Sequence, residues 1–295
     1  MAKNKKAVVL KVPAPLPEVK QWLILGLDPS MSRTGYALMR VRRKLEDDDP
    51  GTRATWLSAG SVKPEVASEP IWLRGKMMAL HLRNIVEDAS AQILSTDPTA
   101  WNLTLRPEAF WTDEKKEPSL GLIISMEYPT PMNDFLVALN RIIHLVFFET
   151  DLWQRFATVR VLTTNAATLR SLMGLTKTGA KNKGENIARA YDFIDKTAYP
   201  KLDTDACDAV LLGMMARHTA SILMGHVDEV PDKHLLSLCN AAQEVKGKGT
   251  RSRIITKGLL HRKEYFYDYV KNNYVLLVRD ASKASQRCTK HEYQL

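Results

Sequence analysis

Four acidic residues are the side chains of this sequence best suited to chemistry. Asp28 ends the apolar run "LILGLD", and Glu127 ends a second run, "LIISME". Asp205 and Asp208 stand in "DTDACDAVLLGMMARH", which has helical periodicity, and residues three apart share one face of a helix. A carboxylate beside buried leucines loses hydration that a strand does not restore. A compensating partner, such as a metal ion, is therefore expected.

Each acid taken alone has an ordinary structural explanation. Asp28 could accept hydrogen bonds from the turn that follows it, Asp203 could cap a helix, and Asp205 or Asp208 could be solvated or favoured by the helix dipole. Together, however, four acids close to one another are electrostatically unfavourable unless cations lie between them. Carboxylate oxygens suit Mg²⁺ or Mn²⁺, and two such ions about 4 Å apart can promote phosphodiester cleavage. The pattern predicts a metal site with hydrolytic chemistry.

A basic, glycine-containing loop, "GLTKTGAKNKGE", follows the last strand of the predicted core. Gly174 and Gly179 have the spacing of a phosphate-binding P-loop, but Ala180 stands where a lysine is required, so no nucleotide cofactor is expected. The lysines of the loop could contact phosphates or stabilise developing charge. A solvated surface loop is the alternative. These lysines are Lys177, Lys181 and Lys183.

The elements needed to position these residues follow from hydrophobic periodicity. Three strands, a helix, a strand, a helix, a strand and then further helices predict an α/β fold, a mixed five-stranded sheet with helices on both faces. The predicted strands are 22–28, 34–43, 53–63, 120–128 and 157–164, and the predicted helices are 71–93, 130–150, 165–173, 184–197 and 205–224.

The domain organisation is predicted from changes in composition. A basic N-terminal tail, 1–20, precedes a core domain, 21–225, which carries a surface insertion at 95–119, and a basic and aromatic C-terminal extension spans 226–295. Basic residues beside "EYFYDYVKNNY" suit phosphate contact and base stacking, but the aromatic residues could equally form a small core under a cationic face. The candidate nucleic-acid contacts in the extension are Lys246, Lys248, Arg251 and Arg253.

The overall charge favours a polyanionic partner. The chain has 42 Lys and Arg against 33 Asp and Glu, a formal net charge of +9, although a cationic surface without such a partner would give the same balance. Three widely spaced cysteines argue against a disulfide framework or a zinc site. No apolar stretch reaches the roughly 20 residues that a bilayer span needs. A soluble, cytoplasmic protein without a membrane partner is expected.

The acidic motifs carry a resemblance to a known family. "ILGLDPSMSRTGYAL", "LIISMEYP" and "DTDACDAVLL", in this order, resemble the motifs of RuvC-like Holliday-junction resolvases in the RNase H-like superfamily. The resemblance covers residues 22 to about 225. It implies an RNase H-like fold and a crossover-junction endodeoxyribonuclease in which Asp28 bridges two Mg²⁺ or Mn²⁺ ions. Glu127, Asp205 and Asp208 would complete the ligand set, and Lys177 and Lys181 would assist catalysis.

The resemblance also implies a substrate and an assembly. Branched DNA, a four-way junction, would be cut by paired symmetric nicks, and a homodimer formed through the helix after Glu127 would present two sites to it. An RNase H-like nuclease acting on RNA or other branched nucleic acid, or a non-catalytic junction-binding protein, are the alternatives. The tail, the insertion and the extension depart from compact members of the family. Only Tyr128 supplies an aromatic residue near Glu127, where the family has one a few residues further on.

Overall fold

The structure is a computed structural model of the chain. It describes residues 8–30, 32–43, 51–64, 68–104, 115–128, 134–148, 151–175, 183–241, 243–246, 252–255, 258–262, 265–268, 274–279 and 289–290.

A six-stranded mixed sheet forms the centre of the fold, in the order β11-β8-β7-β2-β3-β4. The neighbours β2, β7 and β8 run parallel, and β3, β4 and β11 pair antiparallel to their neighbours. The predicted five-stranded mixed α/β sheet is confirmed, and β11 extends it at the β8 edge. The strands are β2 (Gln21–Asp28), β3 (Thr34–Arg43), β4 (Thr52–Val62), β7 (Leu120–Glu127), β8 (Thr158–Thr164) and β11 (Phe266–Asp268).

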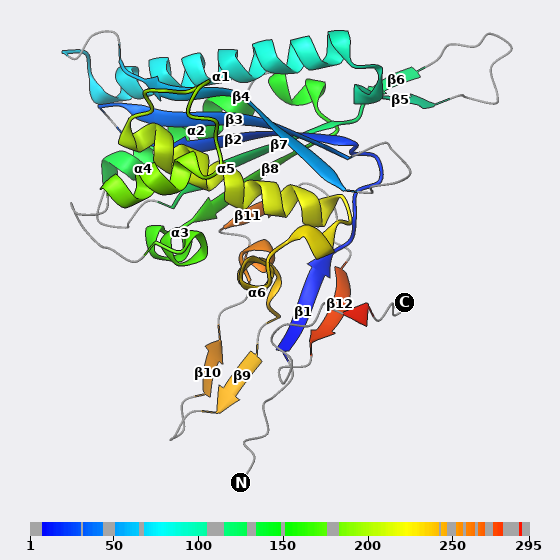
Figure 1. The fold of residues 1–295 in the computed structure, drawn as a ribbon. Helices are drawn as coiled ribbons and strands as arrows, with labels where there is room; N and C mark the ends of the chain where they lie inside the picture. The colour runs from blue at the N-terminus through cyan, green and yellow to red at the C-terminus, as the bar shows by residue number, and fades with distance from the viewer. Residues whose placement is uncertain are drawn as a thin grey trace, which may run out of the picture.

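Helices cover both faces of the sheet, as Figure 1 shows, with α1 and α2 on one side and α5 on the other. Alternation along β2 explains the two cores, since successive side chains of a strand point to opposite faces. Leu23, Leu25 and Leu27 pack in the cluster that contains α1 and α2, whereas Trp22 and Ile24 pack in the cluster that contains α5. The helices are α1 (Ile71–Thr96), α2 (Asp134–Phe148), α3 (Ala166–Met173), α4 (Lys183–Tyr191), α5 (Thr204–Leu223) and α6 (Asp232–Cys239).

Helix α2 buries one face, although its apolar residues surround most of the helix. Leu139, Ile143 and Phe147 are buried at the spacing of a single helical stripe, but Leu145 is 51% exposed. The neighbouring helix α1 packs along α2. None of the helices in the described part of the chain is long and apolar enough to cross a membrane.

Segments from both ends of the chain pack against the central domain. β1 (Val8–Pro13) pairs antiparallel with β12 (Tyr274–Arg279), and Leu10 and Val12 join the core on the α5 side. Leu259, Leu260 and Phe266 from the predicted extension are buried in the same core. The remaining short elements are β9 (Gln243–Lys246), β10 (Ser252–Ile255), β13 (Thr289–Lys290), η2 (Asp151–Arg155), η4 (Val227–Glu229) and η5 (Leu259–His261).

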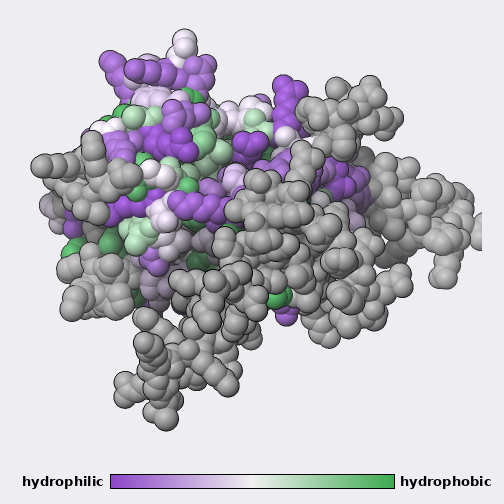
Figure 2. Space-filling model, turned by 60° about the horizontal axis from the view of Figure 1, so that its bottom comes forward, coloured by the Kyte–Doolittle hydropathy of each residue, from purple (hydrophilic) through white to green (hydrophobic). Residues whose placement is uncertain are grey.

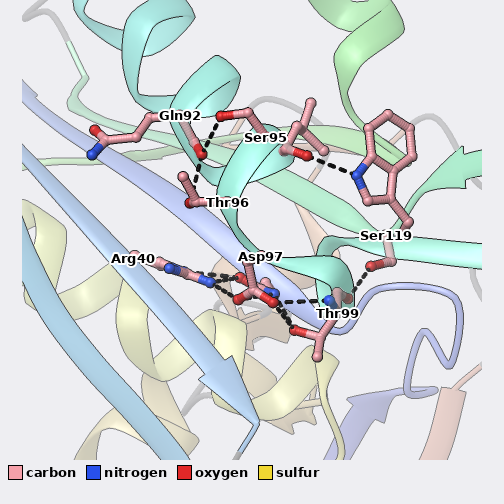
Figure 3. A network of polar contacts seen from close by, with 10 residues as sticks. Arg40, Gln92, Ser95, Thr96, Asp97, Thr99 and Ser119 are labelled. Atoms are coloured by element: carbon pink, nitrogen blue, oxygen red, sulfur yellow. Dashed lines mark hydrogen bonds and ion pairs between the residues drawn. The ribbon is translucent and has the colours of Figure 1, made fainter.

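The base of the predicted 95–119 insertion is an ordered polar network at the Gln21 end of β2 (Figure 3). Arg40 pairs with Asp97 and donates to the side-chain oxygen of Gln21. The side-chain nitrogen of Gln21 donates to Asp97 at 3.1 Å. Thr99 also donates to Asp97, and Ser119 donates to the Thr99 carbonyl at 2.9 Å. The insertion therefore begins and ends in fixed positions, through η1 (Pro98–Ala100), β5 (Trp101–Thr104) and β6 (Lys115–Pro118).

Candidate active site

Asp28 and Glu127 lie at the same edge of the sheet. β2 and β7 are adjacent and parallel, and Leu27 pairs with Met126, so the next residues of the two strands are neighbours. Their alternation places both on the α5 side, because Leu27 and Met126 belong to the core under α1 and α2. The carboxyl ends of two parallel strands thus bring the two acids of the sheet together.

Helix α5 reaches these strand ends because two glycines let it lie directly on the sheet. A side-chain carbon at Gly26 would overlap the carbonyl oxygen of Ala209, and one at Gly35 would overlap the carbonyl of Asp205. Ser125 adds a hydrogen bond to the Leu212 carbonyl at 3.0 Å. The first turns of α5 are therefore held against β2 and β3.

The acids of the site repel one another. Burial, followed by the charges of Asp208, Glu127, Asp205 and Asp203, raises the pKa of Asp28 well above its usual range. Burial and the charge of Asp208 likewise raise the pKa of Glu127. Burial is also the largest influence on Asp208, whose pKa is raised to about 6. None of the ion pairs within the described ranges involves Asp28, Glu127 or Asp208.

Asp205 is in a different electrostatic position, because Arg33 pairs with it. The Arg33 Nε donates to the Asp205 carboxylate at 2.7 Å, and its Nη1 lies 3.3 Å from Asp203. Asp203 caps α5 by accepting from the Ala206 N–H, and it accepts from Ser61 at 2.7 Å. Burial pushes the pKa of Asp203 up, but these hydrogen bonds and the charge of Arg33 hold it below its usual value. The predicted capping role of Asp203 is confirmed.

Polar and cationic residues from α3 and α4 surround the remaining side of the site. Asn186 donates to Asp208 at 2.6 Å. The positive charges of Arg170 and Lys183 both oppose the rise in the Asp208 pKa, and that of Arg170 does the same for Glu127. A phosphate group approaching the carboxylates would meet these two cations.

The chemistry of the donors fits a hard divalent cation. Asp28, Glu127 and Asp208 offer carboxylate oxygens, which Mg²⁺ and Mn²⁺ prefer. Burial first, and then the charges of neighbouring acids, raise their pKa values, so a bound cation would stabilise their charged forms. Within the described ranges, no three His, Cys, Asp or Glu side chains are grouped closely enough to form a ready-made metal site. Charges repel one another over longer distances than a metal–oxygen bond of roughly 2.0–2.2 Å. The acids can therefore raise a neighbour's pKa although they are not grouped as closely as the ligands of a bound metal.

The predicted site residues therefore divide into three groups. Asp28, Glu127 and Asp208 lie close enough for their charges to interact. Asp205 also acts on Asp28 and Asp208 but pairs with Arg33, and Lys183, at the start of α4, acts on Asp208. Sequence reasoning missed Arg33, Arg170 and Asn186. The metal-ligand roles stay predictions. Lys177, Lys181, Lys248 and Arg251 lie outside the described residues, and the side chains of Lys246 and Arg253 are not described.

An aromatic pair connects the site with the C-terminal extension. Tyr128, which follows Glu127, has its ring 5.1 Å from the ring of Tyr265, with the planes inclined by 37°. The N–H of Tyr128 donates to the Thr164 carbonyl at the end of β8. Arg262 stacks on the other partner, with its guanidinium carbon 4.1 Å from the centroid of the Tyr265 ring. The extension thus contributes side chains that pack on Tyr128, the residue after Glu127.

Comparison with known proteins gives a distant structural likeness. No protein-family model and no curated protein matches the sequence. The fold is similar to the Thermus thermophilus RuvC structure, with 13% sequence identity and a TM-score of 0.39 over 69% of this chain and 97% of that one. It is also similar to T. thermophilus RuvC in complex with Holliday junction substrate, with 12% identity, a TM-score of 0.35 and the same coverage. Any function must accordingly be argued from this chain's own residues.

Proposed function

We propose that this protein is a divalent-metal-dependent endonuclease that cuts branched DNA, with the four-way junction as its substrate. The observation that carries the proposal is the placing of Asp28, Glu127 and Asp208 from β2, β7 and α5 at one edge of the sheet, where burial and the charges of neighbouring acids raise their pKa values. Negative charges that a fold holds close to one another favour the binding of a cation, because the cation reduces their repulsion. The net charge of +9 favours a polyanionic substrate.

The protein residues would divide the work as follows. Asp28, Glu127 and Asp208 would hold Mg²⁺ or Mn²⁺, two ions in one site. Bound ions would lower the pKa of an attacking water and stabilise the charge that develops on the phosphodiester. Asn186 fixes the orientation of Asp208 through its 2.6 Å hydrogen bond. Arg170 and Lys183 supply positive charge beside the carboxylates, where the phosphate would lie.

Arg33 has a positioning role in this proposal. By bridging Asp203 and Asp205, it ties the turn after β2 to the first turn of α5. The two elements that deliver Asp28 and Asp208 are thereby linked on the solvent side. Asp205 could join the metal ligands only by giving up this ion pair.

A homodimer is part of the proposal. The two scissile strands of a four-way junction are related by two-fold symmetry, so two copies of the site would cut them in pairs. Leu145 on α2 gives the outer side of that helix an exposed apolar residue, which is consistent with an interface there.

Cleavage of a synthetic four-way junction tests the function. Wild-type protein with Mg²⁺ should give paired symmetric nicks, Glu127→Gln should lose them, and Glu18→Gln, at an exposed position near the opposite end of β2, should keep them. A linear duplex and an RNA–DNA hybrid at the same salt concentration complete the design. Faster cleavage of the hybrid would assign the protein to RNA processing, and junction binding without turnover would make it a non-catalytic binding protein.

A further inference from the structure

An open groove of about 590 Å³ lies beside the site, between α3, α6 and η5. Its volume falls in the range of nucleotide-sized ligands, which is roughly 300–1,000 Å³. Apolar side chains such as Leu172, Leu236 and Leu259 contribute to its lining, and polar ones surround them. The polar lining includes Asn165, Thr168, Ser171, Lys233, Ser237 and Arg262. The groove therefore combines apolar surface with hydrogen-bond donors and two cations.

The charge of the groove is of one sign. Lys233 comes from α6 and Arg262 follows η5, and no acidic residue is among the described residues that line the groove. Lys233 donates to the Ser171 carbonyl, which holds its ammonium against α3, and an ammonium has further N–H donors to offer. Figure 2, in which the lower side of Figure 1 comes forward, shows a mainly hydrophilic described surface with smaller hydrophobic patches. An anionic ligand with a polar backbone fits this lining.

The groove lies next to the end of β8, the strand that pairs with the Glu127 end of β7. Asn165, on its wall, directly follows Thr164, and Thr164 pairs with Glu127 in the sheet. The other connection is aromatic, because Arg262 stacks on Tyr265 and Tyr265 packs on Tyr128. Neighbouring strands lie about 4.8 Å apart, so a chain that leaves the carboxylates across β8 enters the groove after a short distance.

We propose that this groove binds the phosphodiester backbone of the nucleic-acid strand beside the cleaved bond, with Lys233 and Arg262 as its phosphate contacts. The position relative to the cleaved bond rests on the proposed function. Arg262 stacks on Tyr265, and this contact fixes the plane of its guanidinium group before the strand arrives. α6 and η5 come from the C-terminal extension, which gives this part of the chain a role in positioning the substrate.

The shape of the groove favours a strand over a free phosphate. A single phosphate would need converging donors around one point, whereas the cations here stand on α6 and after η5, along an open surface that leads to Tyr128. Tyr128 is 36% exposed and could stack on a base of the same strand. A positively charged groove with aromatic side chains close to it is the combination by which single strands are commonly bound.

Binding of labelled single-stranded DNA and of a four-way junction, measured by fluorescence anisotropy in EDTA, tests the groove without cleavage. The groove variant is Lys233→Gln with Arg262→Gln. The matched control is Arg53→Gln with Lys76→Gln, two exposed cations on β4 and α1. The groove variant should bind single strands about tenfold more weakly, and the slope of log Kd against log salt should fall by about 1.4, since each lost phosphate contact removes about 0.7.

A second variant guards against loss of folding. Ser237→Glu adds a negative charge to the groove and removes neither cation, and it should weaken binding by a similar factor with an unchanged melting temperature. Neutral methylphosphonate linkages, placed one at a time along the strand, should abolish the difference between wild type and groove variant at the linkage that the groove contacts. That linkage should lie within a few nucleotides of the nick.

The possible results separate this inference from the proposed function. Groove variants that bind like the control would overturn the groove assignment, whatever the cleavage assay gives. Adenosine monophosphate that competes as well as an oligonucleotide of equal phosphate content would overturn the assignment to a strand. Wild-type protein that binds through the groove but never nicks a junction would remove the proposed nuclease and leave the groove as a nucleic-acid contact.

Discussion

The two ends of strand β2 treat a partly buried aspartate in opposite ways. At the Gln21 end, Asp97 pairs with Arg40 and accepts hydrogen bonds from Gln21 and Thr99. Burial pushes the pKa of Asp97 up, but these bonds hold it below its usual value. At the other end, burial and four acidic neighbours raise the pKa of Asp28. The fold can neutralise an acid, and at the Asp28 edge it does not.

The difference shows that unfavourable interactions between like charges are concentrated at the Asp28 end of β2. A neutralised network contributes stability, whereas a group of acids that repel one another lowers stability and is typical of a functional site. Substitutions at the two ends should accordingly have opposite signs in stability and unequal effects on cleavage.

Asp28→Asn should have the largest effect. Removing the charge that the site is built around should lower junction cleavage by at least about 10²–10³-fold, a loss typical of removing a major electrostatic contribution. Cleavage rates at saturating Mg²⁺ provide the measurement. Asp88→Asn, at an exposed position of α1, is the control and should cleave like wild type. Unchanged nicking by Asp28→Asn would show that the Asp28 edge is not the active site.

Asp97→Asn should destabilise the protein and leave the cleavage rate of the folded fraction unchanged. Arg40 would lose its carboxylate partner in a partly buried position, which should cost about 2–4 kcal/mol in the free energy of unfolding. Because the folded-state pKa of Asp97 is lowered, its contribution is present above about pH 4 and is lost as pH falls through the folded-state pKa. Urea denaturation at pH 7 and at pH 3 measures both parts. An equal loss at both pH values would contradict the ion-pair explanation.

Asp208→Asn should stabilise the metal-free protein at neutral pH. The pKa of Asp208 is raised to about 6, so the folded state binds more protons than the unfolded state between about pH 4 and 6. The free energy of unfolding therefore falls as pH rises through this window. Because each pKa unit corresponds to about 1.4 kcal/mol, the variant should gain about 2–3 kcal/mol above pH 6 and nothing below pH 4. Melting temperatures measured in EDTA across this pH range test the prediction, with Asp228→Asn, at an exposed position, as the control. A gain in stability that does not depend on pH would contradict the explanation by burial and charge repulsion at Asp208.

Arg33→Ala should have the smallest effect. Its ion pairs with Asp203 and Asp205 are about one-third exposed, so they should contribute about 0.5–1 kcal/mol to stability. Without Arg33, Asp205 no longer has a cation that competes with a metal. The affinity for Mn²⁺ should rise by about two- to fivefold, which is the ion-pair free energy of about 0.5–1 kcal/mol expressed as a ratio of dissociation constants. Calorimetric titration of the variant and of Arg53→Ala gives the comparison. Weaker Mn²⁺ binding would mean that Arg33 positions the ligands more than it competes with the metal.

The strand ends were predictable from the sequence because both depend on local pattern. "LILGLD" and "LIISME" are apolar runs that end in an acid, and the carboxyl ends of parallel strands meet at one edge. The helical spacing of Asp205 and Asp208 is also local. These features place Asp28 and Glu127 at their strand ends and Asp205 and Asp208 on α5, and they predict most of the sheet correctly.

The rest depends on contacts between residues far apart in the sequence. Arg33 could equally have pointed to solvent, and its choice of Asp203 and Asp205 depends on how α5 lies on the sheet. Asn186 is one polar residue of a predicted helix, with nothing in its neighbours that indicates Asp208. Phe266 carried no sign that it would join the sheet edge at β8, because the basic run before it suggested an appendage. Tertiary packing decides all three.

The closeness of α5 to the sheet has a consequence for engineering. Gly26 and Gly35 meet backbone carbonyls of the helix where a side-chain carbon would be. Even a methyl group is too thick for these two gaps, so the distance between the carboxylates of the sheet and those of the helix cannot be varied in small steps. A library that aims to change metal choice or cutting rate should keep both glycines fixed and vary the surrounding side chains instead.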